Sequence, residues 1–274
     1  MRAFLLALLA SLPDHMAGHL DWGAFTTYGS FEDLRREQER EVLEERLGGQ
    51  TAVRRFRRKG FVAVAIDGGA GSGKTSTARA LAERCGYMSV STGEHYRALT
   101  ALFLREGIPA DDGLALRERL RTVRPSTVLC GSRAQIALNG RTFSESELRS
   151  PPVTAAVPAY AAVPALRRFL HDYERQLPAA AEAAGFKGVV LEGRDIASTV
   201  LPNADLRVHL EVNLAERRQR RAREGLVDDV AGRDRQDQKQ MEPPAGVWHL
   251  NGTDLSLEEV VELLCRRLRE MEGP

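Results

Sequence analysis

The chain of 274 residues is poor in cysteine, in net charge and in long apolar runs. Its three cysteines lie far apart and form no CxxC or Cys/His pattern, which argues against zinc and disulfides and favours free thiols in a reducing, cytoplasmic compartment. The 39 basic and 38 acidic residues leave a net charge of +1, so no global attraction to nucleic acids or membranes is expected. No apolar run reaches the roughly 18 residues that a transmembrane helix needs. These absences leave an ordinary soluble globular protein as the expectation.

The composition changes near residue 60, and residues 1–59 are expected to form a helical, charged appendage and linker. The apolar stretch 3–12 is interpreted as a short buried or oligomerising helix rather than a signal peptide, because a single Arg precedes it. Residues 30–48 are dense in Glu and Arg with sparse apolar positions, which predicts a solvated helix. The basic run 54–59 is interpreted as a solvated linker, with an RNA or acidic-partner contact as the alternative. The N-terminal helix is a candidate protein-interaction segment.

From Gly60 onward, short apolar runs alternate with helical patterns. Strands are predicted over residues 61–66, 87–90, 189–191, 206–210 and 248–250, where the apolar runs resemble those of parallel strands buried on both faces. Helices are predicted over 74–84 and 93–105, and after the capping pattern Ser256-x-x-Glu259. This alternation predicts an α/β fold with a doubly wound parallel sheet.

Two segments interrupt the alternation. Residues 127–143 predict a β-hairpin with its turn at Asn139-Gly140, followed by an Ala-rich helical stretch divided by Pro158 and Pro164. These elements would form an insert over about residues 93–185. Residues 217–240 hold many arginines and few apolar residues, which predicts an Arg-rich lid over the site rather than a packed element.

A phosphate-binding loop follows the first predicted strand, where residues 68–75 match G-x-x-x-x-G-K-[ST]. Its backbone N–H groups would surround phosphate oxygens, with the positive end of the next helix behind them. Lys74 would bridge the β- and γ-phosphates of ATP, and the Thr75 hydroxyl would hold Mg²⁺. The motif N-K-x-D is absent from the sequence, which disfavours a GTPase. The predicted ATP-binding residues are Gly68, Gly69, Ala70, Gly71, Ser72, Gly73, Lys74, Thr75 and Ser76.

Four separated motifs resemble those of bacterial cytidylate kinases. They are AIDGGAGSGKTSTARALAERCGYMSVSTGEHYRAL, LEGRDIASTVLPNADLRVHLEVNLAERRQRR, RDRQD and LSLEEVVELL, in that order, and the similarity covers about residues 60–270. The resemblance implies a P-loop kinase fold, an acceptor-binding subdomain in the insert, and phosphoryl transfer from ATP to a nucleoside monophosphate, with CMP or dCMP favoured. Small nucleotides would then be the binding partners.

The chemistry explains why such an enzyme relies on arginines. Both substrates are anions, so catalysis depends on positioning and on positive charge at the transferred group. The acceptor phosphate has a second pKa of about 6 and needs no strong general base. The resemblance implies catalytic roles for Lys74, Arg194 and Arg233, and it implies that Arg217, Arg221 and Arg233 close over ATP while Glu192 helps to hold Mg²⁺. On the acceptor, it places Thr92, Arg97 and Arg194 at the phosphate and Asp237 at a sugar hydroxyl. It places Arg167 and Asp195 on the base or phosphate side of the acceptor.

Some of these residues have plainer interpretations. Residues 91–94 also match a helix capping box, which competes with a phosphate contact by Thr92. The arginines of residues 217–223 also match an exposed helix face. Asp67 is expected to order the phosphate loop rather than to take part in chemistry.

The chain departs from the family pattern on the side that reads the acceptor. Pro158 stands where the family usually has a Ser, and Gln240 stands where an Arg is expected, with Lys239 beside it. Ser91 replaces an expected Asp. Two alternatives therefore stay open, a P-loop kinase of another small acceptor and a non-catalytic nucleotide-binding regulatory paralogue.

Overall fold

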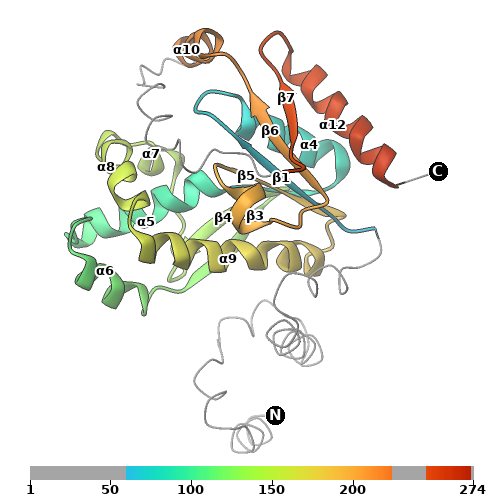
Figure 1. The fold of residues 1–274 in the computed structure, drawn as a ribbon. Helices are drawn as coiled ribbons and strands as arrows, with labels where there is room; N and C mark the ends of the chain where they lie inside the picture. Colours follow the sequence, from blue (N-terminus) through green and yellow to red (C-terminus); the bar gives the residue numbers. More distant parts are fainter. Residues whose placement is uncertain (1–59, 224–244, 273–274) are drawn as a thin grey trace, which may run out of the picture. The chain divides into compact units, whose positions relative to one another are not determined.

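The computed structural model describes residues 60–223 and 245–272, except for the side chains of Arg221, Arg223 and Glu272 (Figure 1). The predicted appendage over residues 1–59, with its helices and basic run, lies outside the described residues. The same holds for Arg233, Asp237, Lys239 and Gln240 in the predicted lid. Within the described ranges, no helix is both long enough and apolar enough to span a membrane.

The strands of the described region form one seven-stranded sheet in the order β3-β4-β2-β5-β1-β6-β7. All neighbouring pairs are parallel except the β3–β4 hairpin. The predicted doubly wound parallel sheet is therefore confirmed. The strand bounds are β1 Val62–Gly68, β2 Met88–Ser91, β3 Pro125–Cys130, β4 Arg133–Leu138, β5 Gly188–Gly193, β6 Leu206–Glu211 and β7 Trp248–Asn251.

The helices connect these strands, as the alternating pattern predicts (Figure 1). The last helix begins with the predicted capping box, because Ser256 N donates to Glu259 Oε2 (2.8 Å) and Glu259 N donates to Ser256 Oγ (3.2 Å). The helix bounds are α4 Lys74–Cys85, α5 Thr92–Glu106, α6 Gly113–Leu120, α7 Glu145–Leu148, α8 Pro151–Ala161, α9 Pro164–Ala183, α10 Leu214–Arg223 and α12 Leu257–Glu272, with a π-helical turn η3 at Ile196–Val200.

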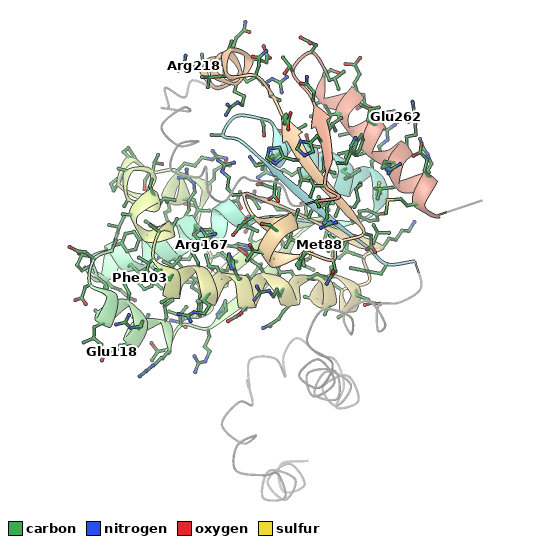
Figure 2. The ribbon with its side chains drawn as sticks, viewed as in Figure 1. Met88, Phe103, Glu118, Arg167, Arg218 and Glu262 are labelled. Carbon is green, nitrogen blue, oxygen red and sulfur yellow. The ribbon has the colours of Figure 1, made fainter. Side chains whose placement is uncertain are left out.

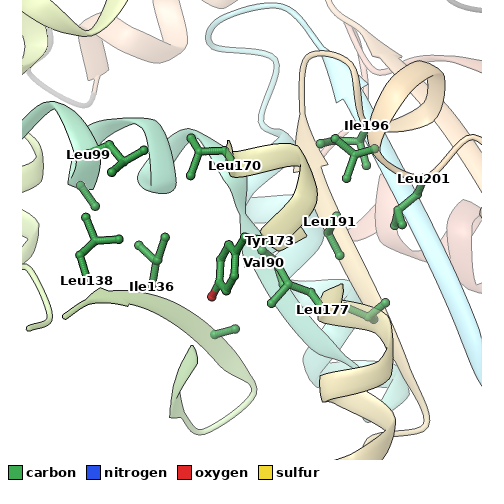
Figure 3. Packing of buried hydrophobic residues seen from close by; sticks show 14 of the residues in the cluster. Val90, Leu99, Ile136, Leu138, Leu170, Tyr173, Leu177, Leu191, Ile196 and Leu201 are labelled. Atoms are coloured by element: carbon green, nitrogen blue, oxygen red, sulfur yellow. The ribbon is translucent and has the colours of Figure 1, made fainter. Parts of the chain in front are cut away.

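Two apolar cores cover the two faces of the sheet. Successive residues of β1 alternate between them, since Ala63 and Ala65 belong to one cluster and Val64 and Ile66 to the other. The first cluster joins the sheet to α5, α6, α8, α9 and η3, and Figure 3 shows part of it between α9 and the strands. The second joins the sheet to α4 and α12. Burial on both faces explains why the strands are apolar runs rather than alternating sequences.

The predicted hairpin exists, but its predicted turn is wrong. The β3–β4 turn is Gly131-Ser132, whereas Asn139-Gly140 makes a second tight turn after β4, in which Leu138 N donates to Arg141 O (2.9 Å). The register follows from long-range pairing, because β4 also lies parallel to β2 and directs Ile136 and Leu138 into the core. The hairpin therefore extends the main sheet.

The predicted division of the Ala-rich stretch is half right. Pro164 begins α9, but Pro158 lies inside α8 and does not end it. The helix continues past Pro158 because its other backbone hydrogen bonds are kept, and Ala162 N donates to Pro158 O (3.2 Å). Val153 and Tyr160 of the same helix are also buried against the core. Packing therefore outweighs the local cost of a proline.

Candidate active site

The candidate site lies at the carboxyl edge of the sheet. Strands β2, β5 and β1 are adjacent and parallel, so their last residues, Ser91, Gly193 and Gly68, end at one edge. The phosphate loop follows β1, helix α5 follows β2, and the Gly193-Arg194-Asp195 segment follows β5. Open α/β sheets bind their ligands at this edge.

The phosphate loop is surrounded by cationic side chains. Lys74 is buried, and its Nζ donates to Gly69 O (2.8 Å). Arg194 donates to Gly68 O, and Arg217 NH1 donates to Ala70 O (3.1 Å). Two predicted ATP-site cations, Lys74 and Arg217, therefore meet at the loop with Arg194, which is predicted at the acceptor phosphate, and an anion would be stabilised there.

The loop itself has the features of a phosphate cradle. Gly71 and Gly73 have φ values of 74° and 88°, in the left-handed region that favours glycine. A side chain at Gly68 would place its Cβ 2.4 Å from Leu210 O, so only glycine fits there. The Ser72 hydroxyl is buried and has no hydrogen-bond partner among the described residues. A phosphate oxygen would supply the missing partner.

Thr75 and Glu192, both predicted at the metal site, are in contact. Thr75 Oγ1 donates to Glu192 Oε1 (2.8 Å), and Ser91 Oγ donates to the same oxygen (2.5 Å). Hydroxyl and carboxylate oxygens are the ligands that Mg²⁺ accepts, usually together with substrate phosphates and water. The described residues hold no cluster of three or more His, Cys, Asp or Glu side chains that could bind a metal by themselves. The oxygen set thus fits Mg²⁺ shared with a nucleotide.

Thr92 and the predicted capping box have a different geometry from the one expected. Ser91 is the N-cap of α5 but makes no side-chain cap bond, so the capping-box interpretation is wrong. Glu94 is held instead by Arg133 NH2 (2.7 and 2.8 Å), on strand β4. Thr92 Oγ1 donates to Glu192 O (2.9 Å) and thereby links the start of α5 to β5. Its predicted phosphate contact stays a prediction.

Arg167 and Asp195, both predicted on the base or phosphate side of the acceptor, lie together. Arg167 NH2 is 2.5 Å from Asp195 Oδ2, and His171 Nε2 is 3.3 Å from the same oxygen. Figure 2 labels Arg167 on α9, beside η3. Burial raises the pKa of Asp195, but the hydrogen bond from His171 and the charge of Arg167 outweigh it, so the pKa lies below its ordinary value. Asp195 is therefore an ionised acceptor.

The two arginines predicted to share the acceptor phosphate contact different elements. Arg97 NH1 donates to Leu148 O (2.9 Å) and Thr154 Oγ1 (3.0 Å), whereas Arg194 contacts the phosphate loop. Arg97 thereby ties α5 to α7 and α8. Their shared role at one phosphate stays a prediction.

Asp67 orders a loop, but the segment after β5 rather than the phosphate loop. Its two carboxylate oxygens accept the backbone N–H groups of Ile196 (2.9 Å) and Ala197 (2.8 Å). Burial raises the pKa of Asp67 to about 6, although both hydrogen bonds oppose the shift. Asp67 thus holds η3, and with it Asp195, next to the phosphate loop.

Helix α10 presents its arginines in two directions. Arg217 reaches Ala70 O and also donates to Val212 O (2.9 Å), and Arg220 NH2 donates to Gly252 O (3.0 Å) before α12. Arg218, labelled in Figure 2, is exposed. The exposed-face interpretation therefore holds for Arg218 alone of these three, and the side chain of Arg221 lies outside the described residues.

Sequence reasoning missed a buried polar network beside Asp195. His95 Nδ1 is 2.9 Å from Glu174 Oε1, and Tyr96 OH is 3.5 Å from His171 Nε2. The available signal was the spacing of Arg167, His171 and Glu174, which places polar residues at i, i+4 and i+7 on one helix face.

The strand, phosphate loop and helix, with the parallel sheet behind them, define a P-loop kinase fold. The cytidylate kinase family model matches residues 64–270. The chain therefore belongs to the cytidylate kinase family and is a kinase.

Individual relatives agree with this assignment. The chain is 34% identical over 225 residues to a cytidylate kinase of an Exiguobacterium strain, covering 77% of this chain and 97% of that protein. It is 37% identical over 225 residues to a bifunctional pantoate ligase/cytidylate kinase of a Synechococcus strain, covering 76% of this chain but only 45% of that protein. A gluconokinase structure from Sinorhizobium meliloti 1021 is similar with a TM-score of 0.40 and 18% identity, covering 79% of this chain and 95% of that one, which is too distant to support an inference.

Proposed function

We propose that the chain transfers the γ-phosphoryl group of ATP to a nucleoside monophosphate, with CMP or dCMP as the favoured acceptor. The observation that carries the proposal is the meeting of three parts at one sheet edge: the phosphate loop with buried Lys74, the Thr75–Glu192 contact, and the Arg167–Asp195 pair. A donor, a metal and an acceptor can be held there side by side.

The donor side is the phosphate loop. Residues 68–76 would surround the ATP phosphates, with Lys74 as the buried cation and Arg217 over the loop. Thr75 and Glu192 would hold Mg²⁺, which neutralises phosphate charge when bound. Arg221 and Arg233 would add positive charge from the lid proposed over about residues 217–240. The Ser72 hydroxyl, which has no partner in the described part of the chain, supports this side of the proposal.

The acceptor side lies between α5, α9 and η3, within the acceptor-binding subdomain proposed over about residues 93–185. Arg97, Arg194 and Thr92 would hold the acceptor phosphate, and Arg167 with Asp195 would face the base or phosphate. Asp237 would contact a sugar hydroxyl. A dianionic acceptor phosphate is itself the nucleophile, so these groups position it and need not remove a proton.

Acceptor choice is where another function has support. Pro158 lies in α8 one turn after Thr154, the partner of Arg97, and its side chain offers no hydroxyl where the family pattern has a serine. A site that has lost a donor rejects the wrong base less strongly. The second candidate is therefore a kinase of the same fold with a relaxed or different small acceptor.

An ADP-release assay with ATP, Mg²⁺ and CMP, dCMP, UMP, AMP or shikimate separates these candidates. The proposal expects turnover with CMP or dCMP above all other acceptors. Equal turnover with UMP would favour the second candidate in its relaxed form, and turnover with shikimate alone would favour it with a different acceptor. No turnover with any acceptor, in a folded protein that binds ATP, would overturn both and leave the non-catalytic paralogue.

A further inference from the structure

A cluster of polar side chains is buried between α5 and α9, beside η3. On α9, three of its members lie at i, i+4 and i+7, so they share the face that packs toward α5. The remaining members come from the second turn of α5 and the start of η3. The members of this α5–α9 cluster are His95, Tyr96, Arg167, His171, Glu174 and Asp195.

Burial makes the cluster costly. His95 is 2% exposed, Glu174 1%, and His171 and Asp195 8% each. Glu174 Oε2 has no partner within the described residues, and burial raises the pKa of this carboxyl. Buried polar groups destabilise a fold unless they are paired, and apolar side chains would pack as well at these positions. The cluster is therefore better explained by a task at the site than by stability.

Asp195 is held from two sides. Its Oδ2 lies 2.5 Å from Arg167 NH2 and 3.3 Å from His171 Nε2. An ionised carboxylate only accepts hydrogen bonds, so a hydrogen bond at this contact requires the proton on His171 Nε2. Tyr96 OH lies 3.5 Å from the same nitrogen, and the Arg167 guanidinium lies 5.8 Å from the centre of the Tyr96 ring. His171 is thus a second side chain, besides Arg167, that contacts the Oδ2 atom of Asp195.

We propose that His171 is a positioning residue for the acceptor nucleotide, because its Nε2–H holds the Asp195 carboxylate in the orientation that the acceptor meets. The inference rests on the proposed function, since it needs Arg167 and Asp195 to face the acceptor. A fixed carboxylate accepts a hydrogen bond from an exocyclic amino group, as on cytosine, and meets the carbonyl oxygen of uracil unfavourably. His171 would therefore support base choice on the side where Pro158 has no donor to offer.

The test compares three substitutions by their geometry. His171→Gln keeps an amide N–H near the position of Nε2, whereas His171→Asn keeps polarity but is too short to reach Asp195. His171→Leu removes the donor altogether. A hydrogen bond to a charged group contributes about 1.5–3 kcal/mol, so its loss corresponds to roughly tenfold to a hundredfold in acceptor affinity.

The expected result is a change in the KM for the acceptor CMP without a matching change in the KM for the donor ATP. His171→Leu and His171→Asn should raise the KM for CMP about tenfold or more and reduce the CMP:UMP preference, with the KM for ATP and kcat within about threefold. His171→Gln should stay within about threefold of the unmodified protein in all constants. His249→Leu is the matched control, since His249 also pairs with a carboxylate (Nδ1 to Glu211 Oε1, 2.6 Å) but is exposed on β7. It should leave both KM values unchanged.

Several outcomes would overturn the inference. If the His171→Gln and His171→Asn variants behave alike, or if His171→Leu leaves the KM for CMP unchanged, His171 does not position the acceptor. Equal effects on CMP and ATP, together with a lower Tm, would show a purely structural role. If the Leu variant does not fold, the Gln–Asn comparison still decides. An unmodified protein that phosphorylates no acceptor would overturn the proposed function and this inference together, whereas an active protein indifferent to His171 would overturn this inference alone.

Discussion

Glu192 shows how single side chains assemble this site from distant parts of the chain. Its Oε1 accepts from Thr75, at the start of the phosphate-loop helix, and from Ser91, at the end of β2. Its backbone carbonyl accepts from Thr92 (2.9 Å). One residue of β5 thereby connects the proposed ATP side to the proposed acceptor side. This explains how a serine can stand where the family pattern has an aspartate, since it donates to a carboxylate already present.

At the same scale, Lys74→Ala should lower phosphoryl transfer by roughly 10²-fold or more while the fold is kept. The substitution removes a buried cation from the loop where the transferred phosphate would lie. The measurements are ADP release and Tm. Lys187→Ala is the matched control, because Lys187 is exposed and precedes β5 at the opposite edge of the sheet. A Lys74→Ala protein with more than about a tenth of the activity would remove this residue from the mechanism.

The pH dependence of stability is set in part by His209 on β6. Burial lowers the pKa of His209, and His249, Lys74 and Arg194 lower it further, against the opposing charge of Glu211. Below about pH 6.5, the unfolded chain therefore binds a proton at this residue that the folded chain resists. Relative to the His209→Gln variant, the unmodified protein should therefore lose free energy of unfolding as the pH drops from about 7 to 5, while the raised pKa values of Asp67 and Glu174 contribute with the opposite sign and alike in both proteins. Urea unfolding at several pH values measures it, and identical slopes in both proteins would contradict the assignment.

At the scale of elements, α4 and α12 pack together on one face of the sheet, and their apolar side chains share one core. Arg84 adds ion pairs to Glu258 (2.7 Å) and Glu262 (3.0 Å), but such exposed pairs are screened by water and contribute little to stability. The contact between these helices therefore depends on apolar packing. It brings the ends of the described region together, since α4 follows the first strand and α12 is the last helix.

A cysteine pair tests this helix packing directly. Cys85 Sγ, at the end of α4, lies 3.8 Å from Cys265 Sγ on α12. Hydrogen peroxide should oxidise the two thiols to one intramolecular disulfide, with two molecules of water released per disulfide. Mass spectrometry should find the linked peptides in the unmodified protein and in a Cys130→Ser variant, since Cys130 is exposed on β3. Products linked only through Cys130 would contradict the packing of α4 on α12.

At the scale of the molecule, the described residues 60–223 and 245–272 form a seven-stranded sheet with an apolar core on each face. A chain that starts at Gly60 should therefore fold and bind ATP without the proposed appendage over residues 1–59. Circular dichroism, thermal unfolding and calorimetric titration with ATP measure the outcome against the full chain. Insolubility or lost ATP binding would show that the first residues complete the core, and the proposed boundary near residue 60 would be wrong.

Local patterns in the sequence determined the strand positions, the phosphate loop and the fold class. A strand buried on both faces must be apolar along its length, and a loop that wraps phosphate must carry glycines and a lysine at fixed spacing. Both signals occupy a few consecutive residues, so they can be recognised before folding is known. The same holds for the capping box at Ser256, whose two partners are three residues apart.

Only the tertiary structure decided which residues meet. The hairpin turn lies at Gly131 rather than Asn139-Gly140 because β4 must pair with β2, which no local signal encodes. His95 meets Glu174 although 79 positions separate them, and Thr75 meets Glu192 across 117. Such contacts arise when helices on one face of the sheet pack together and when parallel strands end at one edge. The sequence alone identified the loop proposed to bind phosphate, and packing determined which residues meet on the proposed acceptor side.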